Sequence, residues 1–441
     1  MDVVPAVTAD LPASPTVLVA TGNWWALASR VAIAFARNGW KTVAVCPPHS
    51  PLCYVKRVCP VLPLSTLAPR RSLIEAIRTA RPDLIVPCDD STVFLLHEIH
   101  AEHPDLRQII EHSLGPPDTF AMVESRDQLQ RIAADSGIRV PRSIALDSST
   151  LAAERFADFP RGAVVKLDGT NGGEGVTVVR SQAEAAAAFR RARSATSAAI
   201  AAKRALVNRD PYAFWTWRRR KHTRITMQEF ISGTPANIMV ACWQGEVLAA
   251  VSVEALSCQG PTGAANIVRR IERPEFREAA AAVAARLKLS GFFGLDFMID
   301  RESDLAYMIE MNPRCTQLGH LQFPDQGDLV SALCERAAGR PSAPATQPIR
   351  ESVVAFFPQA WRWKWEAHDW KSAFHDIPWG EDALINNLLC EPWPDQQWPA
   401  RLYHRLRAPQ RPEAALFQSR SRNPIRPGGN HRLEPGESIP P

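Results

Sequence analysis

The sequence predicts a mixed α/β and α+β protein, with a doubly wound parallel sheet at its N-terminal end and antiparallel hairpins after it. Short apolar strands alternate with helical segments from residue 16 to residue 103, which favours a parallel sheet. From residue 161 onwards, paired apolar segments separated by Gly-containing or acidic turns predict β-hairpins instead. With 441 residues, 46% of them hydrophobic, the chain is long enough for two or three domains with a sizeable core.

The composition argues against several classes of protein. The net charge of +5 is a mild excess, much of it in the Arg218–Arg224 run and the C-terminal end, so a chain-wide basic face for nucleic acid is not indicated. Nine cysteines are scattered without a C-x-x-C pair or zinc-type spacing, which indicates reduced thiols. We find no signal peptide and no apolar run approaching the ~20 residues of a membrane span. We therefore expect a cytoplasmic protein that does not act at a membrane.

The N-terminal part contains the segments that define the parallel sheet. The predicted strands are Thr16–Ala20, Lys41–Cys46 and Asp83–Pro87, and the predicted helices are Trp25–Arg37, Arg71–Arg81 and Thr92–His103. Gly22 lies in the first strand–helix turn, but the G-x-G-x-x-G fingerprint is absent, so the turn is weak evidence for a nucleotide site. Asp89 and Asp90 follow a strand end, at the sheet edge where α/β proteins bind ligands. An N-cap for the following helix is at least as good an interpretation.

A glycine-rich hairpin with a lysine at its base is the first candidate ligand site. Its predicted strands are Ala163–Leu167 and Val176–Arg180, and residues 168–175 (DGTNGGEG) form the loop between them. Four glycines allow the backbone to approach a ligand closely, and successive amides in such a loop can cradle phosphate oxygens. Lys166 adds a positive charge at the strand end. The alternative is a hairpin that binds nothing.

The other elements are predicted from apolar patterns and turn residues. They are two short helices within Pro116–Asp135, the second beginning at Arg126; an extended segment at 138–146; helices at Ser181–Arg193, Glu275–Leu289 and Asp328–Ala338; strands at Arg224–Ser232, Asn237–Trp243, Glu246–Glu254 and Ser352–Phe357; and a polar loop at Gly260–Arg270. Residues 194–222 contain aromatic residues beside a basic run. This pattern suits single-stranded nucleic acid, but a surface insertion or substrate-contacting flap is the simpler interpretation. From about Leu406 the composition predicts disorder.

The stretch Gly291–His320 is the second candidate site, with two predicted strands joined by an acidic turn. Residues two apart lie on one face of a strand, so Glu310 and Asn312 project together beside Asp296 of the partner strand. Two carboxylates and an amide oxygen form the hard oxygen site that Mg²⁺ prefers. Arg314 follows, with a guanidinium suited to phosphate or carboxylate. Acidic residues that simply face water are the alternative, which is weakened because Glu310 and Asn312 lie in an apolar run.

These motifs, in this order, resemble the ATP-grasp superfamily, and proteins of the biotin carboxylase and carbamoyl phosphate synthase type. The resemblance rests on V-V-K-x-D-G-x-x-G-G-x-G-V at 164–176, Gln-Glu-Phe-Ile at 228–231 and M-I-E-M-N-P-R at 308–314, and it covers about Val17 to Arg340. It implies ATP held between two β-rich subdomains. The implied domains are an N-terminal α/β domain at 1–120, an ATP-grasp domain at 121–340 with subdomains 121–230 and 231–340, an aromatic-rich extension at 341–405 and a disordered tail at 406–441.

The resemblance also implies a role for each matching residue. ATP is expected to contact Arg126, Lys166, Gly169, Gly172, Gly173, Gly175, Gln228, Glu229, Phe230 and Ile231. Asp296, Glu310 and Asn312 are expected to hold Mg²⁺, with Mn²⁺ as an alternative, and Arg314 and Lys166 to be catalytic. Three positions depart from the family pattern: Arg126 replaces a common Lys, Asp296 a frequent Glu, and Thr234-Pro235 stand where a Glu often contacts the ribose.

The implied activity is that of an ATP- and Mg-dependent carboxylate–amine ligase. A carboxylate would attack the γ-phosphate of ATP, and an amine would then displace phosphate from the acyl phosphate. The expected partners are a small carboxylate and a small amine, and the resemblance allows a homodimer. One alternative is a non-catalytic module that binds Mg·ATP for regulation, although regulation needs fewer polar groups than this set. Nucleic-acid binding through residues 212–224 and the basic tail is a third interpretation.

Overall fold

The computed structural model describes residues 14–65, 67–167, 175–195, 224–259, 263–339, 348–362, 370–390 and 396. All of these belong to the first of two compact units, Met1–Gln396, and the second unit is Gln397–Pro441. Three predictions fall on residues outside the described ones: the glycine-rich loop at 168–174, the aromatic and basic segment within 194–222, and the disordered tail at 406–441. Within the described residues, no helix is long and apolar enough to cross a membrane.

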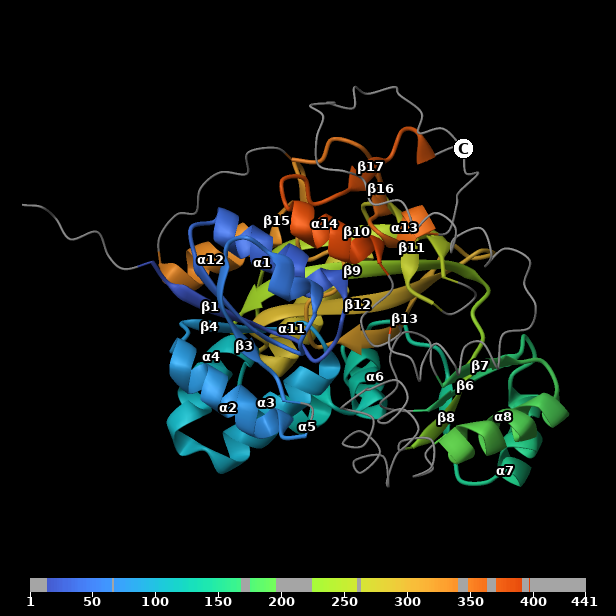
Figure 1. Ribbon diagram of the computed structural model, residues 1–441. Helices are drawn as coiled ribbons and strands as arrows, with labels where there is room; N and C mark the ends of the chain where they lie inside the picture. Colours follow the sequence, from blue (N-terminus) through green and yellow to red (C-terminus); the bar gives the residue numbers. More distant parts are fainter. Residues whose placement is uncertain are drawn as a thin grey trace, which may run out of the picture. The chain divides into compact units, whose positions relative to one another are not determined.

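The N-terminal region is the predicted doubly wound parallel sheet. Its strands, in the order β3-β2-β1-β4, are β1 (Thr16–Ala20), β2 (Lys41–Cys46), β3 (Val58–Pro63) and β4 (Leu84–Pro87), and its helices are α1 (Ala26–Arg37), η1 (Pro51–Tyr54), α2 (Pro69–Ala80), α3 (Asp90–Glu102), η2 (Pro104–Leu106) and α4 (Arg107–Leu114). Both faces of β1 are buried, because Val17 and Val19 pack towards α1 while Leu18 and Ala20 pack towards α2, α3 and α4. Figure 1 shows α1 and these three helices on opposite sides of the sheet.

A second, antiparallel sheet carries the predicted lysine hairpin. Its strand order is β5-β8-β6-β7, with β5 (Ser143–Leu146), β6 (Ala163–Leu167), β7 (Val176–Val179) and β8 (Ile225–Glu229). The chain reaches it through η3 (Pro117–Thr119), α5 (Phe120–Val123) and α6 (Arg126–Asp135). The helices α7 (Ser149–Arg155) and α8 (Gln182–Ala195), with η4 (Phe156–Asp158) after α7, pack on one another, as Figure 1 shows, and cover the apolar residues of this sheet.

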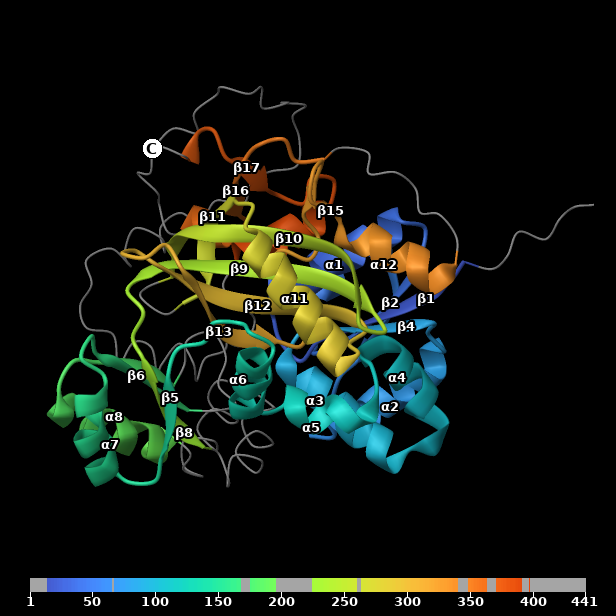
Figure 2. The same ribbon diagram turned by 180° about the vertical axis from the view of Figure 1, so that it is seen from behind.

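The largest sheet has seven strands in the order β13-β12-β9-β10-β11-β16-β17. They are β9 (Gly233–Trp243), β10 (Glu246–Cys258), β11 (Ala265–Arg270), β12 (Gly291–Asp300), β13 (Ala306–Asn312), β16 (Val353–Phe356) and β17 (Phe374–Asp376). The short pair β14 (Gln322–Phe323) and β15 (Gly327–Asp328) precedes α12 (Leu329–Ala338), and α13 (Gln359–Arg362) and α14 (Asp382–Leu389) lie near the end of the described chain. The helix α11 (Pro274–Leu287) runs across one face of this sheet (Figure 2).

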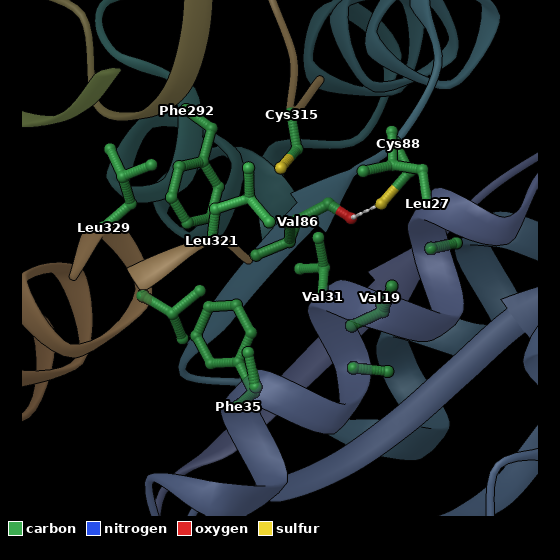
Figure 3. Close-up of a cluster of buried hydrophobic side chains, with 14 of the residues drawn as sticks. Val19, Leu27, Val31, Phe35, Val86, Cys88, Phe292, Cys315, Leu321 and Leu329 are labelled. Atoms are coloured by element: carbon green, nitrogen blue, oxygen red, sulfur yellow. Dashed lines mark hydrogen bonds between the residues drawn. The ribbon is translucent and has the colours of Figure 1, made fainter. Parts of the chain in front are cut away.

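Alternate residues of the large sheet enter two different cores. On β9, Ile238 and Val240 pack with α11, whereas Met239 and Ala241 join the core that contains α1 and α12. Figure 3 shows this second core, where the side chains of α1 and of the N-terminal strands face Phe292 and residues that follow β13. The N-terminal sheet and the large sheet therefore share one apolar core.

Some predicted elements were wrong in type or extent. The segment Gly260–Arg270 is not simply a polar loop, because residues 265–270 form β11, and its Ile267 and Val268 are buried between β10 and β16. The strand predicted to begin at Asn237 begins at Gly233. The strands β3 and β17 and the helices α4, α7 and α14 were not predicted. Short strands at a sheet edge depend on pairing with distant segments, which local pattern does not reveal.

Candidate active site

A row of polar side chains crosses three neighbouring strands of the large sheet. Asn237 on β9 lies opposite Asp296 on β12, and Asp296 lies opposite Glu310 on β13. Asn312 lies opposite Gly294, one step further along the same face. The structure therefore brings Asp296, Glu310 and Asn312 together, as the hairpin pattern predicted, and adds Asn237, which the sequence analysis did not select.

A β-bulge in β13 puts the acidic residues on the correct face. The pairing shifts between Asp296 and Phe297, so that Phe297 lies opposite Met308 rather than Ile309. Met308 and Met311, three residues apart, both enter the α11 core as a result. Without the extra residue, Glu310 would share the face of Met308 and be buried among apolar side chains. Bulges near functional sites often redirect a side chain in this way.

Asp296 is the centre of the hydrogen bonding in this row. Its Oδ1 accepts a hydrogen bond from Asn237 Nδ2, and its Oδ2 accepts one from Asn312 Nδ2 at 2.8 Å. Arg314 Nη2 in turn donates to Asn312 Oδ1 at 3.3 Å. Burial and the nearby Glu310 carboxylate raise the pKa of Asp296, and the two amide hydrogen bonds and Arg314 offset only part of this effect. Because Asp296 and Glu310 lie directly opposite one another on neighbouring strands, the repulsion between their carboxylates favours a bound cation.

Arg126 joins this row to the strand that carries the predicted phosphate lysine. Its Nη2 lies 2.5 Å from Glu310 Oε1, and its Nη1 donates to the carbonyl of Leu167, the residue after Lys166, at 3.3 Å. The position of Arg126 is set by helix α6, whose N-cap Ser125 accepts a hydrogen bond from the Gln128 amide. A guanidinium with five donors can span two such partners, which a lysine ammonium does less well.

Arg314 is held from the other side by residues next to the N-terminal sheet. The side chain is 7% exposed, and its Nε donates to Asp90 Oδ1 at 2.8 Å. The ring of Trp25 lies 5.7 Å from the guanidinium carbon. Asp90 is therefore the residue of the Asp89-Asp90 pair that contacts a predicted site residue.

Asp89 caps a helix, which was the alternative to a role in ligand binding. It is the N-cap of α3, and its Oδ1 accepts from the Thr92 amide at 2.9 Å. Its Oδ2 accepts from the Gly22 amide at 2.6 Å and from the Thr21 hydroxyl at 3.0 Å. Asp89 thus fixes the turn after β1 to the start of α3, at the carboxyl edge of the sheet.

The predicted nucleotide residues lie on two adjacent strands and the segment that follows them. Lys166 is 8% exposed on β6, and its Nζ donates to Gln228 Oε1 on β8. Glu229 Oε1 lies 3.5 Å from Arg161 Nη2, and the Phe230 amide donates to the carbonyl of Gly162 at 3.1 Å. Ile231 is 4% exposed, and Gly175 has a φ of 73°. Gly169, Gly172 and Gly173 lie outside the described residues, and the nucleotide roles of the whole set stay predictions.

The donor set of the row fits Mg²⁺. Its oxygens come from two carboxylates and two amides, the hard ligands this ion takes. Asn237 Oδ1 is buried and has no hydrogen-bond partner among the described residues, while Nδ2 of the same side chain donates to Asp296. The described residues contain no group of three His, Cys, Asp or Glu side chains placed to hold a metal, so a site here requires the amide oxygens or a ligand to complete it. The metal roles of Asp296, Glu310 and Asn312 remain predictions.

Comparison with known proteins indicates the kind of fold. Residues 125–321 match the family described as carbamoyl-phosphate synthase L chain, ATP binding domain. Solved structures with a similar fold include carboxyaminoimidazole ribonucleotide synthase from Aspergillus clavatus complexed with ATP, with a TM-score of 0.56, 14% identity, and coverage of 78% of this chain and 81% of that one. No curated protein matches the sequence.

Two further solved structures extend this likeness. Biotin carboxylase from Campylobacter jejuni has a TM-score of 0.53 and 16% identity, and the match covers 77% of this chain and 73% of that one. L-amino acid ligase from Bacillus licheniformis has a TM-score of 0.53 and 16% identity, over 76% of this chain and 77% of that one. At identities this low, the structural similarity establishes the fold alone.

Proposed function

We propose that this chain is an ATP-grasp protein that acts as an ATP-dependent ligase and joins a carboxylate to an amine, which is supported by the family match of residues 125–321 and by the solved structures that it resembles. The observation that carries the proposal is the row of Asn237, Asp296, Glu310 and Asn312, in which Arg126 donates to Glu310 and Arg314 donates to Asn312. Oxygen ligands flanked by fixed positive charges suit a triphosphate and a carboxylate. A domain that bound ATP only as a regulator would need fewer of these groups.

The proposed reaction has two balanced steps. A carboxylate oxygen of the substrate attacks the γ-phosphorus of ATP, the bond to the β-phosphate oxygen breaks, and ADP leaves. The amine nitrogen then attacks the acyl carbon of the acyl phosphate, phosphate leaves, and the nitrogen loses a proton. Charge develops mainly on phosphoryl oxygens, so catalysis depends on positioning and on nearby positive groups.

Each residue of the site has a part in that positioning. Mg²⁺ held by Asp296, Glu310 and Asn312 would neutralise charge on the phosphate oxygens. Lys166 contacts phosphate from β6, next to the contact that Arg126 makes with Leu167. Arg314 orients the carboxylate or the transferred phosphoryl group, and Asp90 fixes its guanidinium plane through Nε.

A substrate screen tests the proposal. Purified protein is incubated with ATP, Mg²⁺ and a panel of carboxylic acids and amines, and release of ADP and phosphate is measured. We expect release that requires a carboxylate, and a coupled product that requires both substrates. If ATP binds but no combination in a broad panel stimulates phosphate release, the regulatory alternative is correct.

Glu310→Gln tests the site assigned to this reaction. Removing the charge of one carboxylate should lower turnover about 100-fold or more, as loss of a metal ligand or its support commonly does. Glu302→Gln is the matched control, since Glu302 lies in the turn of the same hairpin and its side chain is 85% exposed. Turnover unchanged in Glu310→Gln would show that the metal assignment is wrong.

A further inference from the structure

Two cysteines at the N-terminal sheet lie in contact, and neither belongs to the row of site residues. Cys46 is the last residue of β2, and Cys53 lies in the short helix η1 that follows. Their sulfur atoms are 3.6 Å apart, within hydrogen-bonding distance for sulfur. Cys46 is 1% exposed and Cys53 is half-buried, so an external reagent reaches Cys53 first.

The surroundings make the two thiols chemically different. The hydrogen bond from the Cys46 thiol lowers the pKa of Cys53, and the backbone amides of His49, Ser50 and Cys53 add to this effect, while burial opposes it. The same hydrogen bond and burial raise the pKa of Cys46. Cys53 is therefore the better nucleophile, and Cys46 is a protonated thiol directly beside it.

The other cysteines lack this combination. Cys88, Cys242, Cys315 and Cys334 are buried, and burial is the main cause that raises the pKa of each. Cys258 is partly buried, and burial raises its pKa as well, whereas Cys59 and Cys390 are exposed. Among the described residues, Cys46 and Cys53 are the only two cysteines joined by a hydrogen bond between their sulfur atoms.

We propose that Cys53 and Cys46 form a reversible disulfide site whose oxidant is a low-molecular-weight peroxide. The Cys53 thiolate attacks one peroxide oxygen, the O–O bond breaks, hydroxide leaves, and a sulfenic acid forms. The Cys46 sulfur then attacks the Cys53 sulfur and the S–O bond breaks. The departing hydroxyl group takes the Cys46 proton and leaves as water. Two thiols lose two electrons and two protons, and hydrogen peroxide is reduced to two waters.

The disulfide requires a small local movement. A disulfide bond is about 2.05 Å long, so the sulfur atoms must approach from their separation of 3.6 Å. The loop between the cysteines is bonded to the turn after β1, since Pro48 O accepts from Trp24 Nε1 at 3.0 Å and Ser50 Oγ donates to Asn23 O at 3.4 Å. Formation of the disulfide would therefore also pull on the turn that leads to Trp25, through these two hydrogen bonds.

Peptide mass mapping tests the site directly. Both cysteines fall in one tryptic peptide, residues 42–56, whereas Cys59 falls in a separate one, residues 58–70. The reduced, folded protein is treated with hydrogen peroxide, alkylated and digested. We expect peptide 42–56 to lose two hydrogen atoms and both alkylation sites, to recover them with dithiothreitol, and to react before the peptide of Cys59.

Two variants separate the roles of the thiols. In Cys46→Ser, Cys53 should stop at sulfenic acid and be trapped by dimedone. In Cys53→Ser, Cys46 should stay alkylatable. In the wild type near pH 7, Cys53 should be alkylated about threefold or more faster than Cys59. The proposal is overturned if peroxide leaves both thiols of peptide 42–56 intact, or if either pairs with another cysteine instead.

Discussion

Lys166 is a nearly buried lysine whose Nζ donates to Gln228 Oε1 on the adjacent strand. If it contacts phosphate, Lys166→Ala should weaken binding of ADP about tenfold or more, because a charge-assisted hydrogen bond to phosphate is lost. Titration calorimetry with ADP and Mg²⁺ measures the change. Lys41→Ala, at an exposed residue of β2, is the control and should leave the affinity unaltered. Equal affinities for Lys166→Ala and the wild type would count against the phosphate role.

Asn237 offers a second prediction at the residue scale. Asn237→Ala removes a donor to Asp296 and an amide oxygen that has no other partner among the described residues. We expect affinity for Mg·ADP to fall about tenfold, since residues that orient metal ligands usually contribute this much. Thermal shifts with Mg·ADP and with ADP plus EDTA separate the metal from the nucleotide. Asn386→Ala, at an exposed residue of α14, is the matched control, and an equal metal-dependent shift in both variants would refute this role.

The sequence predicted the residues of one hairpin better than those that join it from elsewhere. Glu310 and Asn312 share a face because they are two residues apart, which local pattern reveals. Asn237 joins them only because β9 pairs with β12 in one register, and this pairing spans 59 residues of sequence. The available signal was an asparagine at the start of the predicted strand 237–243, which is too common a feature to select alone.

At the scale of elements, Gly233 is where the chain passes from the β8 sheet into the large sheet. It opens β9 opposite Asp300, and a Cβ atom there would lie 1.8 Å from the carbonyl oxygen of Ile299. Gly233→Ala should therefore lower the free energy of unfolding by about 2 to 3 kcal/mol, since backbone atoms must move. Denaturant titration measures it, with the exposed Ser232→Ala as control. A difference between the two variants below about 0.5 kcal/mol would contradict the steric argument.

Element type was predictable where a segment carries its own periodic pattern. The parallel strands β1, β2 and β4 and the hairpin of β12 and β13 lie where apolar runs and turn residues placed them. The sequence predicts a loop at β11 because only Ile267 and Val268 are strongly apolar there, and the buried Asn266 beside them interrupts the pattern of a strand. Its pairing with β10 and β16 determines its conformation, and that pairing is not local.

At the scale of the whole described chain, one buried charge cluster ties three distant segments together. Asp376 on β17 lies 3.6 Å from Arg30 Nη2 on α1, and its two carboxylate oxygens lie 3.0 and 3.1 Å from His320 Nε2. Arg30 and Asp376 are 346 residues apart in sequence, so no local pattern could predict the pair. The cluster fixes the C-terminal strand against the first helix and against the segment that follows the site residues.

Asp376→Asn tests how much this cluster contributes. Burial alone would raise the pKa of Asp376, but the neighbouring His320 and Arg30 outweigh it and the pKa is lowered. A lowered carboxyl pKa stabilises the fold at any pH above the ordinary value near 4, and that stabilisation is lost as pH falls through the lowered pKa. The variant should be about 3 kcal/mol less stable at neutral pH, because Arg30 is left buried without its partner charge.

The pH dependence distinguishes this ion cluster from a packing effect. Denaturant titrations from pH 7 downwards should show the difference between wild type and Asp376→Asn shrinking once the pH drops below about 4. Asp382→Asn is the control, because Asp382 is 84% exposed in its ion pair with Lys56 and its loss should change little at any pH. A difference for Asp376→Asn that stays constant with pH would mean that shape and hydrogen bonding, rather than charge, attach β17 to α1.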